Sequence, residues 1–308
     1  MIQPVGEPLF LRRGAAEARI GTVAAALRSL TVGGADLTQP TPDDRPPASS
    51  NGIVLSPWPN RVRDARWTWN GRPQQLDITE VDRGNALHGL LQFTEYEVRD
   101  RADDQVTLAA TIYPQHGWPF VLETWVRYRL LDDGLEVTHG AVNHSADPAP
   151  YATGTHPFLR VGDAPIADLR ITVPAARYLA VDDRLNPTGL PPVDGTAFDL
   201  RGDPRVGDLA LDTAYGELTL TDVDGGRGTS ATLVAPDGAR TILRQDVAWG
   251  WAQVYTTHQY ASPDGPIDAV AVEPMTAPPD ALNSGTDLVW IAPGETWEGG
   301  WELRRAEA

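Results

Sequence analysis

Short runs that alternate between apolar and polar residues, separated by turn residues, recur along this chain. Arg66–Trp69 alternates, Asn70-Gly71 follows, and Gln74–Ile78 forms a second extended run. Asn-Gly between two extended runs is a strong local signal for a β-hairpin, since both residues tolerate positive φ. The pattern therefore predicts a hairpin over residues 66–78.

The middle of the chain holds the longest extended runs. Residues 120–131 are followed by Asp132-Asp133-Gly134 and then by residues 135–143, which predicts two long strands joined by a tight turn. Residues 15–30 are rich in alanine, but glycines at 21 and 33–34 interrupt the pattern, so we predict strands there rather than a helix. Further strands are expected at 106–113, 169–173, 218–221, 231–234, 241–244, 251–255, 269–273, 288–291 and 297–304.

Composition agrees with a chain of many short strands. The 308 residues include 29 glycines and 27 prolines, which suit turns and interrupt long helices. Many antiparallel strands must stack their sheets or pair their edges, so we predict an all-β fold, a large antiparallel β-sandwich. Residues 163–207 are the most loop-like, but apolar strands resume on both sides. We therefore treat residues 1–308 as a single domain.

Charge and cysteine content narrow the possible partners. The formal net charge is -17, which argues against nucleic acid and acidic membrane surfaces, because both are bound through clustered Lys and Arg. No apolar run reaches the roughly 18–20 residues of a membrane helix, and residues 1–14 do not resemble a signal peptide. The absence of cysteine excludes disulfides, thiol catalysis and thiolate metal sites, and suits a reducing cytoplasm. We expect a cytoplasmic protein with a small, neutral ligand.

Three polar residues stand in settings that suggest chemistry. His88 lies in Leu87-His88-Gly89, His156 lies in Thr155-His156-Pro157-Phe158, and Glu273 ends the apolar run Ala269–Val272. A carboxylate at a strand end can meet two imidazoles from distant segments, which would place a base and an acid in one cleft. Each residue alone also has a structural interpretation, as a buried histidine, a turn residue or a solvated charge. The remaining histidines are His116 and His258, weaker candidates for the cleft rim, and His139 and His144, expected in strands or turns.

A series of short motifs, in order from Asn60 to Asn283, resembles the aldose 1-epimerase (galactose mutarotase) family. Each motif alone is weak, but their shared order is specific. The motifs are Asn60-Arg61-Val62, Trp67–Gly71, Leu87-His88-Gly89, Gly117-Trp118-Pro119, Gly154–Phe158, Leu211–Tyr215, Val254-Tyr255-Thr256 and Glu273–Ala281.

The resemblance implies a fold and a reaction. The fold would be the large β-sandwich of galactose mutarotases, often called a supersandwich. The reaction would interconvert the α- and β-anomers of a hexose through the open-chain aldehyde. Neither a metal nor an organic cofactor would be required, because positioned acid and base groups supply about 10²–10⁴-fold each to a reaction that already proceeds in water.

The resemblance also implies a role for five residues. Glu273 would be the general base on the C1 hydroxyl, His156 the general acid on the ring oxygen, and His88 a hydrogen-bonding helper near C1. Arg61 would hold a sugar hydroxyl or orient Glu273, and Asp212 would accept hydrogen bonds from the sugar. Ordinary pKa values of about 4.3 for Glu and 6.5 for His would suit these exchanges of protons.

Three motifs differ from the common family pattern and bear on which sugar is bound. His156 lies in Thr-His-Pro-Phe, Gly89 is followed by Leu90-Leu91 rather than by a second glycine, and Glu273 is followed by Pro-Met-Thr. These forms resemble a bacterial subgroup. They leave open galactose, glucose or a modified hexose, including an anionic one. An anionic sugar would need an added cation, for which the sequence offers Arg63, Arg66 and Arg83.

Aromatic residues suggest how a sugar would be held. An aromatic face packs well against the C–H face of a hexose. Of the ten tryptophans, Trp118 and Trp249, with Trp58, are the candidates for that contact, and the others are expected in the core.

Two alternatives come from other functional classes. His88, His156 and Glu273 could form a two-histidine, one-carboxylate metal site, although no His-x-His pair is present. A non-catalytic sugar-binding or sensing protein would keep the cleft but would not need Glu273. Both a monomer and a homodimer are compatible with the sequence.

Overall fold

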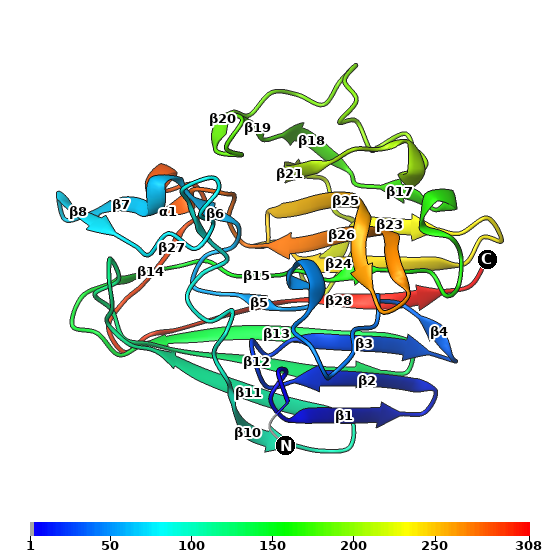
Figure 1. Cartoon of the computed structure of the whole chain (residues 1–308), viewed down its shortest axis with the longest axis horizontal. Coiled ribbons are helices and arrows are strands. Elements are labelled where there is room, and N and C mark those ends of the chain that lie inside the picture. The colour runs from blue at the N-terminus through cyan, green and yellow to red at the C-terminus, as the bar shows by residue number, and fades with distance from the viewer. Residues whose placement is uncertain (1–2) are drawn as a thin grey trace.

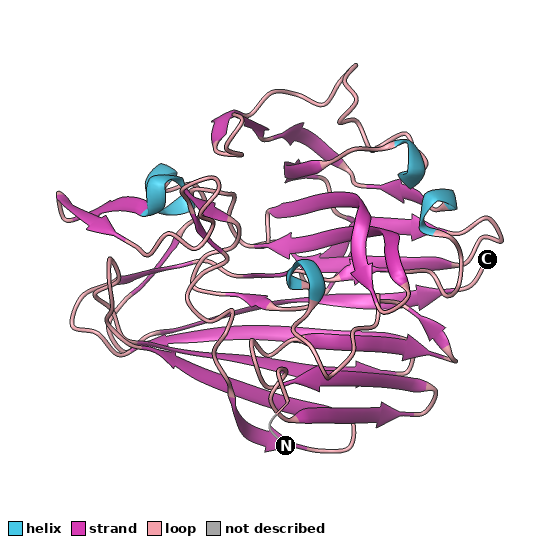
Figure 2. Cartoon of the chain, in the orientation of Figure 1, coloured by secondary structure: helices cyan, strands magenta, loops and turns pink. Residues whose placement is uncertain are grey.

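Strands account for nearly all the regular structure of the chain, as Figure 2 shows for the computed structural model, which describes residues 3–308. A single α-helix, α1 (Ala281–Ser284), occurs among these residues, together with short 3₁₀ helices at 48–50, 63–65, 166–168 and 206–208. The all-β prediction is confirmed. The predicted hairpin of 120–143 forms as β12 (Leu122–Leu131) and β13 (Gly134–Asn143), whereas β25 (Trp251–Ser262) and β26 (Gly265–Met275) extend well beyond the predicted 251–255 and 269–273.

The first layer of the sandwich is a nine-stranded antiparallel sheet. Its order is β10-β11-β12-β13-β28-β24-β23-β17, and β22 pairs with β23. The long hairpin predicted over residues 120–143 lies at its centre. The strands are β10 (Glu97–Arg101), β11 (Gln105–Ile112), β12 (Leu122–Leu131), β13 (Gly134–Asn143), β28 (Thr296–Ala306), β24 (Arg240–Asp246), β23 (Arg227–Val234), β17 (Arg170–Thr172) and β22 (Thr221–Asp224).

Two further sheets make up the rest of the sandwich (Figure 1). The seven-stranded sheet has the order β18-β21-β25-β26-β15-β5, with β16 paired to β26, and the other is the meander β1-β2-β3-β4. The seven strands are β18 (Ala175–Tyr178), β21 (Asp212–Leu218), β25 (Trp251–Ser262), β26 (Gly265–Met275), β15 (Gly154–Thr155), β5 (Val54–Leu55) and β16 (Phe158–Leu159). The meander strands are β1 (Pro8–Arg13), β2 (Ala16–Gly21), β3 (Leu27–Val32) and β4 (Ala35–Asp36).

Four two-stranded ladders complete the structure, and one of them carries part of the site described below. They are β14 (Ala149–Tyr151) with β27 (Val289–Ile291), β19 (Ala180–Val181) with β20 (Pro187–Gly189), β6 (Arg61–Val62) with β9 (Ala86–Leu87), and β7 (Arg66–Trp69) with β8 (Arg72–Gln75).

Strand β12 shows how alternation builds the core. Successive side chains of a strand point to opposite faces, and in β12 Leu122, Val126 and Leu130 are buried whereas Arg129 is exposed. The Tyr128 hydroxyl on the buried face donates to the backbone oxygen of Ala25 at 2.7 Å. The nine-stranded sheet thereby contacts the chain that leads from β2 into β3.

The predicted hairpin after residue 65 forms with the expected turn. Strand β7 pairs with β8 in antiparallel register, Trp69 opposite Arg72, and Asn70 and Gly71 have φ of 49° and 73°. The strand ends at Gln75, earlier than predicted. Strands β2 and β3 likewise replace any helix in residues 15–30, as expected.

One predicted strand is wrong. The run at 218–221 spans the end of β21 and the start of β22. Glu217 has a φ of 52°, and the Thr219 amide donates to the Pro174 carbonyl at 2.7 Å. The backbone therefore turns from one sheet to the other inside a run that is apolar enough to suggest a strand.

The loop-like residues 163–207 are tied to both large sheets. Within them β17 pairs with β23 of the nine-stranded sheet, and β18 pairs with β21 of the seven-stranded sheet. This double attachment joins residues 163–207 to both large sheets. Across residues 3–308, no helix has the length and apolar character needed to span a membrane.

Candidate active site

A cavity of about 310 Å³ gathers the histidines, the carboxylates and the arginine singled out in the sequence. They come from five places in the fold: β26, β21, β6, the residue after β9, and the link between β15 and β16. The side chains that line the cavity are Ser49, Ser50, Asn60, Arg61, Arg83, Leu87, His88, His156, Asp212, Tyr255 and Glu273.

Glu273 is held in a buried position on β26. Its register partner on β25 is Gln253, whose side-chain amide donates to Asp212 Oδ1 at 2.6 Å. Only 1% of Glu273 is exposed. Burial raises the pKa of its carboxyl well above the usual range, the negative charge of Asp212 raises it further, and the charge of Arg61 opposes both. This raised pKa differs from the ordinary value used in the sequence argument.

His156 faces Glu273 from the link between β15 and β16. Its Nε2 lies 3.2 Å from Glu273 Oε1, and its ring stacks on Phe158 with centroids 5.4 Å apart. Backbone bonds from His156 to Ile53 and from Gly52 to His156 fix the segment on both sides. Burial lowers the pKa of His156 to about 4, which again differs from the ordinary value used in the sequence argument.

His88 stands edge-on to His156, with ring centroids 5.5 Å apart. It has a φ of 60°, and its backbone amide donates to Asn60 at 2.8 Å. Burial, then the charges of His156 and Arg61, lowers the pKa of His88 well below its usual value. His88 is therefore a neutral ring that can present an N–H or a lone pair to a ligand.

Arg61 reaches the cavity from β6, but most of its donors are already engaged. Its Nε and Nη2 bond to the Glu80 carboxylate at 3.0 Å each, its Nη1 bonds to Asn60 Oδ1 at 3.2 Å, and Nη2 lies 3.9 Å from Asp212. Burial alone would raise the pKa of Glu80, but hydrogen bonds from Arg61 and Asn85 outweigh it and lower that pKa. Glu80 therefore stays charged and holds the guanidinium in place.

Three polar atoms in the cavity have no hydrogen-bond partner among the described residues: Glu273 Oε2, His156 Nδ1 and His88 Nδ1. A buried polar atom without a partner is costly. His156 contacts both Glu273 and His88, so the three atoms lie in one site, which is suited to a ligand with several polar groups. A base and an acid 3.2 Å apart can exchange protons with two adjacent oxygens of such a ligand.

The structure corrects the tryptophan predictions. Trp118 and Trp249 are 0% exposed, Trp58 is 2% exposed, and none of them lines the cavity. Trp118 packs against Trp58 at 5.8 Å and lies among the core aromatics of the β7–β8 hairpin, while Trp249 packs against His139. Full burial of a large apolar ring contributes the most hydrophobic free energy, and these three rings are fully buried in the core rather than in the cavity wall.

The aromatic side chain that does line the cavity is Tyr255. It lies opposite Asp212 in the β21–β25 ladder and edge-on to Phe158, with centroids 6.1 Å apart. The sequence placed Tyr255 in a motif but assigned it no role. The strand register that places Tyr255 opposite Asp212 cannot be read from the sequence.

Several residues at the cavity carried no signal in the sequence. Glu80 stands in a polar stretch like many others, and Ser49 and Ser50 lie in a short 3₁₀ helix with positive φ of 49° and 58°. Of the three arginines proposed for an anionic ligand, Arg83 lines the cavity and bonds to Glu80 at 3.1 Å, whereas Arg63 and Arg66 do not line it.

The weaker histidine candidates lie elsewhere. His116 pairs with Asp77 and His258 with Asp268, both exposed at the surface. His139 lies in β13, as expected, and is buried. Residues 3–308 contain no group of three or more His, Asp and Glu side chains arranged to hold a metal ion, so the metal-site alternative has no supporting geometry.

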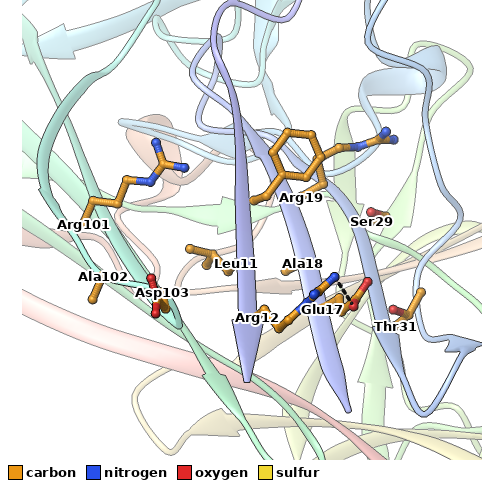
Figure 3. Close-up of a pocket in the computed structure, with 11 residues that line it drawn as sticks. Leu11, Arg12, Glu17, Ala18, Arg19, Ser29, Thr31, Arg101, Ala102 and Asp103 are labelled. Carbon is orange, nitrogen blue, oxygen red and sulfur yellow. Dashed lines mark ion pairs between the residues drawn. The ribbon is translucent and has the colours of Figure 1, made fainter. Parts of the chain in front are cut away.

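A second, larger hollow of about 800 Å³ lies over strands β1 to β3. Figure 3 shows its Arg12–Glu17 ion pair, which measures 2.8 Å between Arg12 Nη2 and Glu17 Oε1. None of the residues predicted for the site lines it.

Comparison with known proteins gives one consistent result. A model of the aldose 1-epimerase family matches residues 9–304. The uncharacterized protein YihR of Escherichia coli K12 is 32% identical over 94% of this chain and 90% of its own length. Mouse galactose mutarotase is 30% identical over 51% of this chain and 46% of its own length.

Solved structures share the whole fold. An aldose epimerase homologue from C. elegans has a TM-score of 0.84 at 19% identity, covering 98% of this chain and 100% of its own. Galactose 1-epimerase from Lactobacillus acidophilus has a TM-score of 0.78 at 20% identity, covering 98% and 94%.

Proposed function

Because the chain belongs to the aldose 1-epimerase family, we propose that it is a cofactor-independent isomerase that interconverts the α- and β-anomers of a hexose. One observation carries the proposal: His156 Nε2 and Glu273 Oε1 lie 3.2 Å apart in the wall of a cavity of about 310 Å³. The C1 hydroxyl oxygen and the ring oxygen of an aldose are both bonded to C1. An acid and a base must therefore be neighbours to act on them together.

Ring opening moves two protons. Glu273 takes the proton of the C1 hydroxyl while His156 gives a proton to the ring oxygen, the C1–O bond of the ring breaks, and C1 becomes an aldehyde carbon. Rotation about C1–C2 then presents the other face of the aldehyde. The hydroxyl that was the ring oxygen then attacks that face and gives its proton back to His156. Glu273 returns its proton to the aldehyde oxygen, which becomes the C1 hydroxyl of the other anomer.

The shifted pKa values decide which of the two proton positions in this cycle is favoured. Before ring opening the pair holds one proton on His156, and after ring opening it holds one proton on Glu273. Burial lowers the pKa of His156 and raises that of Glu273. It therefore favours the state after ring opening, in which both groups are neutral, over the charged pair that opens the ring. The pair needs a single proton throughout, and only its position changes.

The surrounding side chains are proposed to bind and orient the sugar. His88, neutral and edge-on to His156, would hydrogen-bond near the ring oxygen. Asp212, a third exposed at its side chain, would accept sugar hydroxyls. Arg61, fixed by Glu80, would stabilise the ionised form of Glu273 and hold a hydroxyl with its remaining donors.

The direct test is an NMR anomer-exchange panel on the purified protein. Pure anomers of neutral hexoses, pentoses and acidic sugars are mixed with the enzyme, and the approach to anomeric equilibrium is compared with that in buffer. We expect at least one aldose to equilibrate much faster with the protein. Saturable binding of a sugar without acceleration would instead identify a non-catalytic sugar-binding protein.

A further inference from the structure

His139 lies outside the cavity, in a polar cluster between the two main sheets. It is on β13 of the nine-stranded sheet and is 1% exposed. Its Nδ1 lies 3.2 Å from Thr153 Oγ1, and its Nε2 lies 3.2 Å from Thr155 Oγ1. The Trp301 indole also donates to Nε2, at 3.2 Å. Burying an imidazole is costly unless its nitrogens have hydrogen-bond partners, and here both nitrogens have them.

The partners define the tautomer of the ring. An indole N–H can only donate, so Nε2 of His139 must carry the lone pair. The ring proton then lies on Nδ1, where it donates to Thr153 Oγ1, and the Thr155 hydroxyl shares Nε2 with Trp301. Burial lowers the pKa of His139 to about 3, in agreement with a neutral ring that is a fixed connector rather than a proton carrier.

Both threonines belong to the segment that carries His156. Thr153 and Thr155 flank Gly154 of β15, and His156 is the next residue. Strand β15 has only two residues, which pair with β26 at one position, Gly154 opposite Met275, and with β5 at two positions. Ladders this short leave the segment with few backbone bonds, so side-chain bonds to it add to what fixes its position.

The same cluster reaches the segment that carries Glu273. The Thr153 amide donates to Thr276 Oγ1 at 2.8 Å, and the Thr276 amide donates to the Thr153 carbonyl at 2.9 Å. Thr276 follows the end of β26, three residues after Glu273. One chain of bonds therefore runs from His139 through Thr153 to the strand of the proposed base.

We propose that His139 is a positioning residue for the reaction: as the Nδ1–H tautomer it ties the segments of His156 and Glu273 to the nine-stranded sheet and sets the contact between them. The expected effect of His139 on the reaction rate rests on the proposed function, whereas its effect on the positions of the two segments does not. His139 does not line the cavity and exchanges no proton with the sugar.

The test compares three variants with a matched control. His139→Leu removes all three side-chain bonds, and Thr155→Val removes one of them while nearly keeping the side-chain shape. His139→Gln retains a donor and an acceptor and should recover part of the loss. The control is Val137→Ala, on the same face of β13 and fully buried, which loses packing but no hydrogen bond.

We expect His139→Leu to lower kcat at saturating sugar by about tenfold to 100-fold with KM changed by less than about threefold, since small misplacements of reacting groups are costly. Thr155→Val should show a smaller loss of kcat, which keeps the test usable if His139→Leu does not fold. Val137→Ala should lose thermal stability yet keep kcat. Equal kcat in the wild type, His139→Leu and Thr155→Val would overturn the proposal.

A second readout does not depend on activity. In protein labelled with ¹⁵N at its six histidines, His139 should show a protonated Nδ1 and an unprotonated Nε2. Thr155→Val should move the ring signals of His156, and Val137→Ala should leave them in place. Unmoved His156 signals would contradict the positioning role even if the wild type is an active epimerase. A wild type inactive on every sugar, with His156 signals that move as expected, would refute only the proposed function.

Discussion

Burial, together with the charges of Asp212 and Arg61, sets the pH range in which the pair of Glu273 and His156 can hold a single proton. The pair gains a second proton as pH falls through the lowered pKa of His156, about 4, and loses its only proton as pH rises through the raised pKa of Glu273. Activity should therefore follow a bell-shaped pH profile. Its alkaline limb should lie well above the ordinary pKa of a glutamate.

Asp212→Asn tests this account at the level of one charge. The negative charge of Asp212 raises the pKa of Glu273, so its removal should lower that pKa and move the alkaline limb of the kcat profile to lower pH. Asn still offers an oxygen to the Gln253 amide, which now donates to Asp212 Oδ1. We expect KM to rise more than kcat falls, because sugar hydroxyls lose a charged acceptor.

The control for that variant is Asp224→Asn, which removes an exposed charge on β22 away from the cavity. It should leave the pH profile and KM unchanged. A large loss of kcat in Asp212→Asn with unchanged KM would contradict the binding role of Asp212. An alkaline limb that stays at the same pH would contradict the claim that the charge of Asp212 raises the pKa of Glu273.

At the level of elements, the turn after β9 determines where His88 points. Gly89 has a φ of 78°, and a Cβ at this position would lie 2.0 Å from the Ser56 carbonyl oxygen. The backbones of Gly89 and Ser56 form a bridge, so neither can move without shifting His88. The Leu-His-Gly motif thus owes its glycine to close backbone approach as well as to φ.

Gly89→Ala should therefore destabilise the protein by more than the roughly 1–2 kcal/mol of left-handed strain alone, and it should lower activity through His88. Gly71→Ala is the matched control, because Gly71 has a φ of 73° but no atom within 4 Å of its added Cβ. Thermal or denaturant unfolding of both variants measures the difference. Equal destabilisation would show that the contact with Ser56 does not matter.

Over the whole molecule, alternation and turn residues predicted the all-β class and many of the strands, but not how the strands are ordered in sheets. The β7–β8 hairpin follows from Asn70-Gly71, and β12 and β13 follow from two long alternating runs around one turn. These are local signals that survive in the fold because one face of each strand is buried. The strand predicted at 218–221 was wrong, because the chain leaves one sheet and enters the other near Glu217, and no turn residue within 218–221 indicates this.

The site was less accessible to prediction. His88, His156, Glu273, Arg61 and Asp212 all line one cavity, in agreement with the family motifs. The shifted pKa values of Glu273 and His156 come from burial that no motif reports. The predictions that Trp118 and Trp249 face the sugar were wrong, because residue type alone does not say which face of a segment points into the core. The roles of Glu80, Tyr255 and His139 depend on contacts between distant strands.

The central claim is that Glu273 and His156 together move protons at C1 and the ring oxygen of a sugar. It is tested most directly by exchange NMR on the best aldose of the panel, comparing the wild type with Glu273→Gln and His156→Ala. Each variant should fold normally, bind the sugar, and lose about 10²–10⁴-fold of the anomerisation rate. Anomerisation at the wild-type rate in both variants would contradict the account.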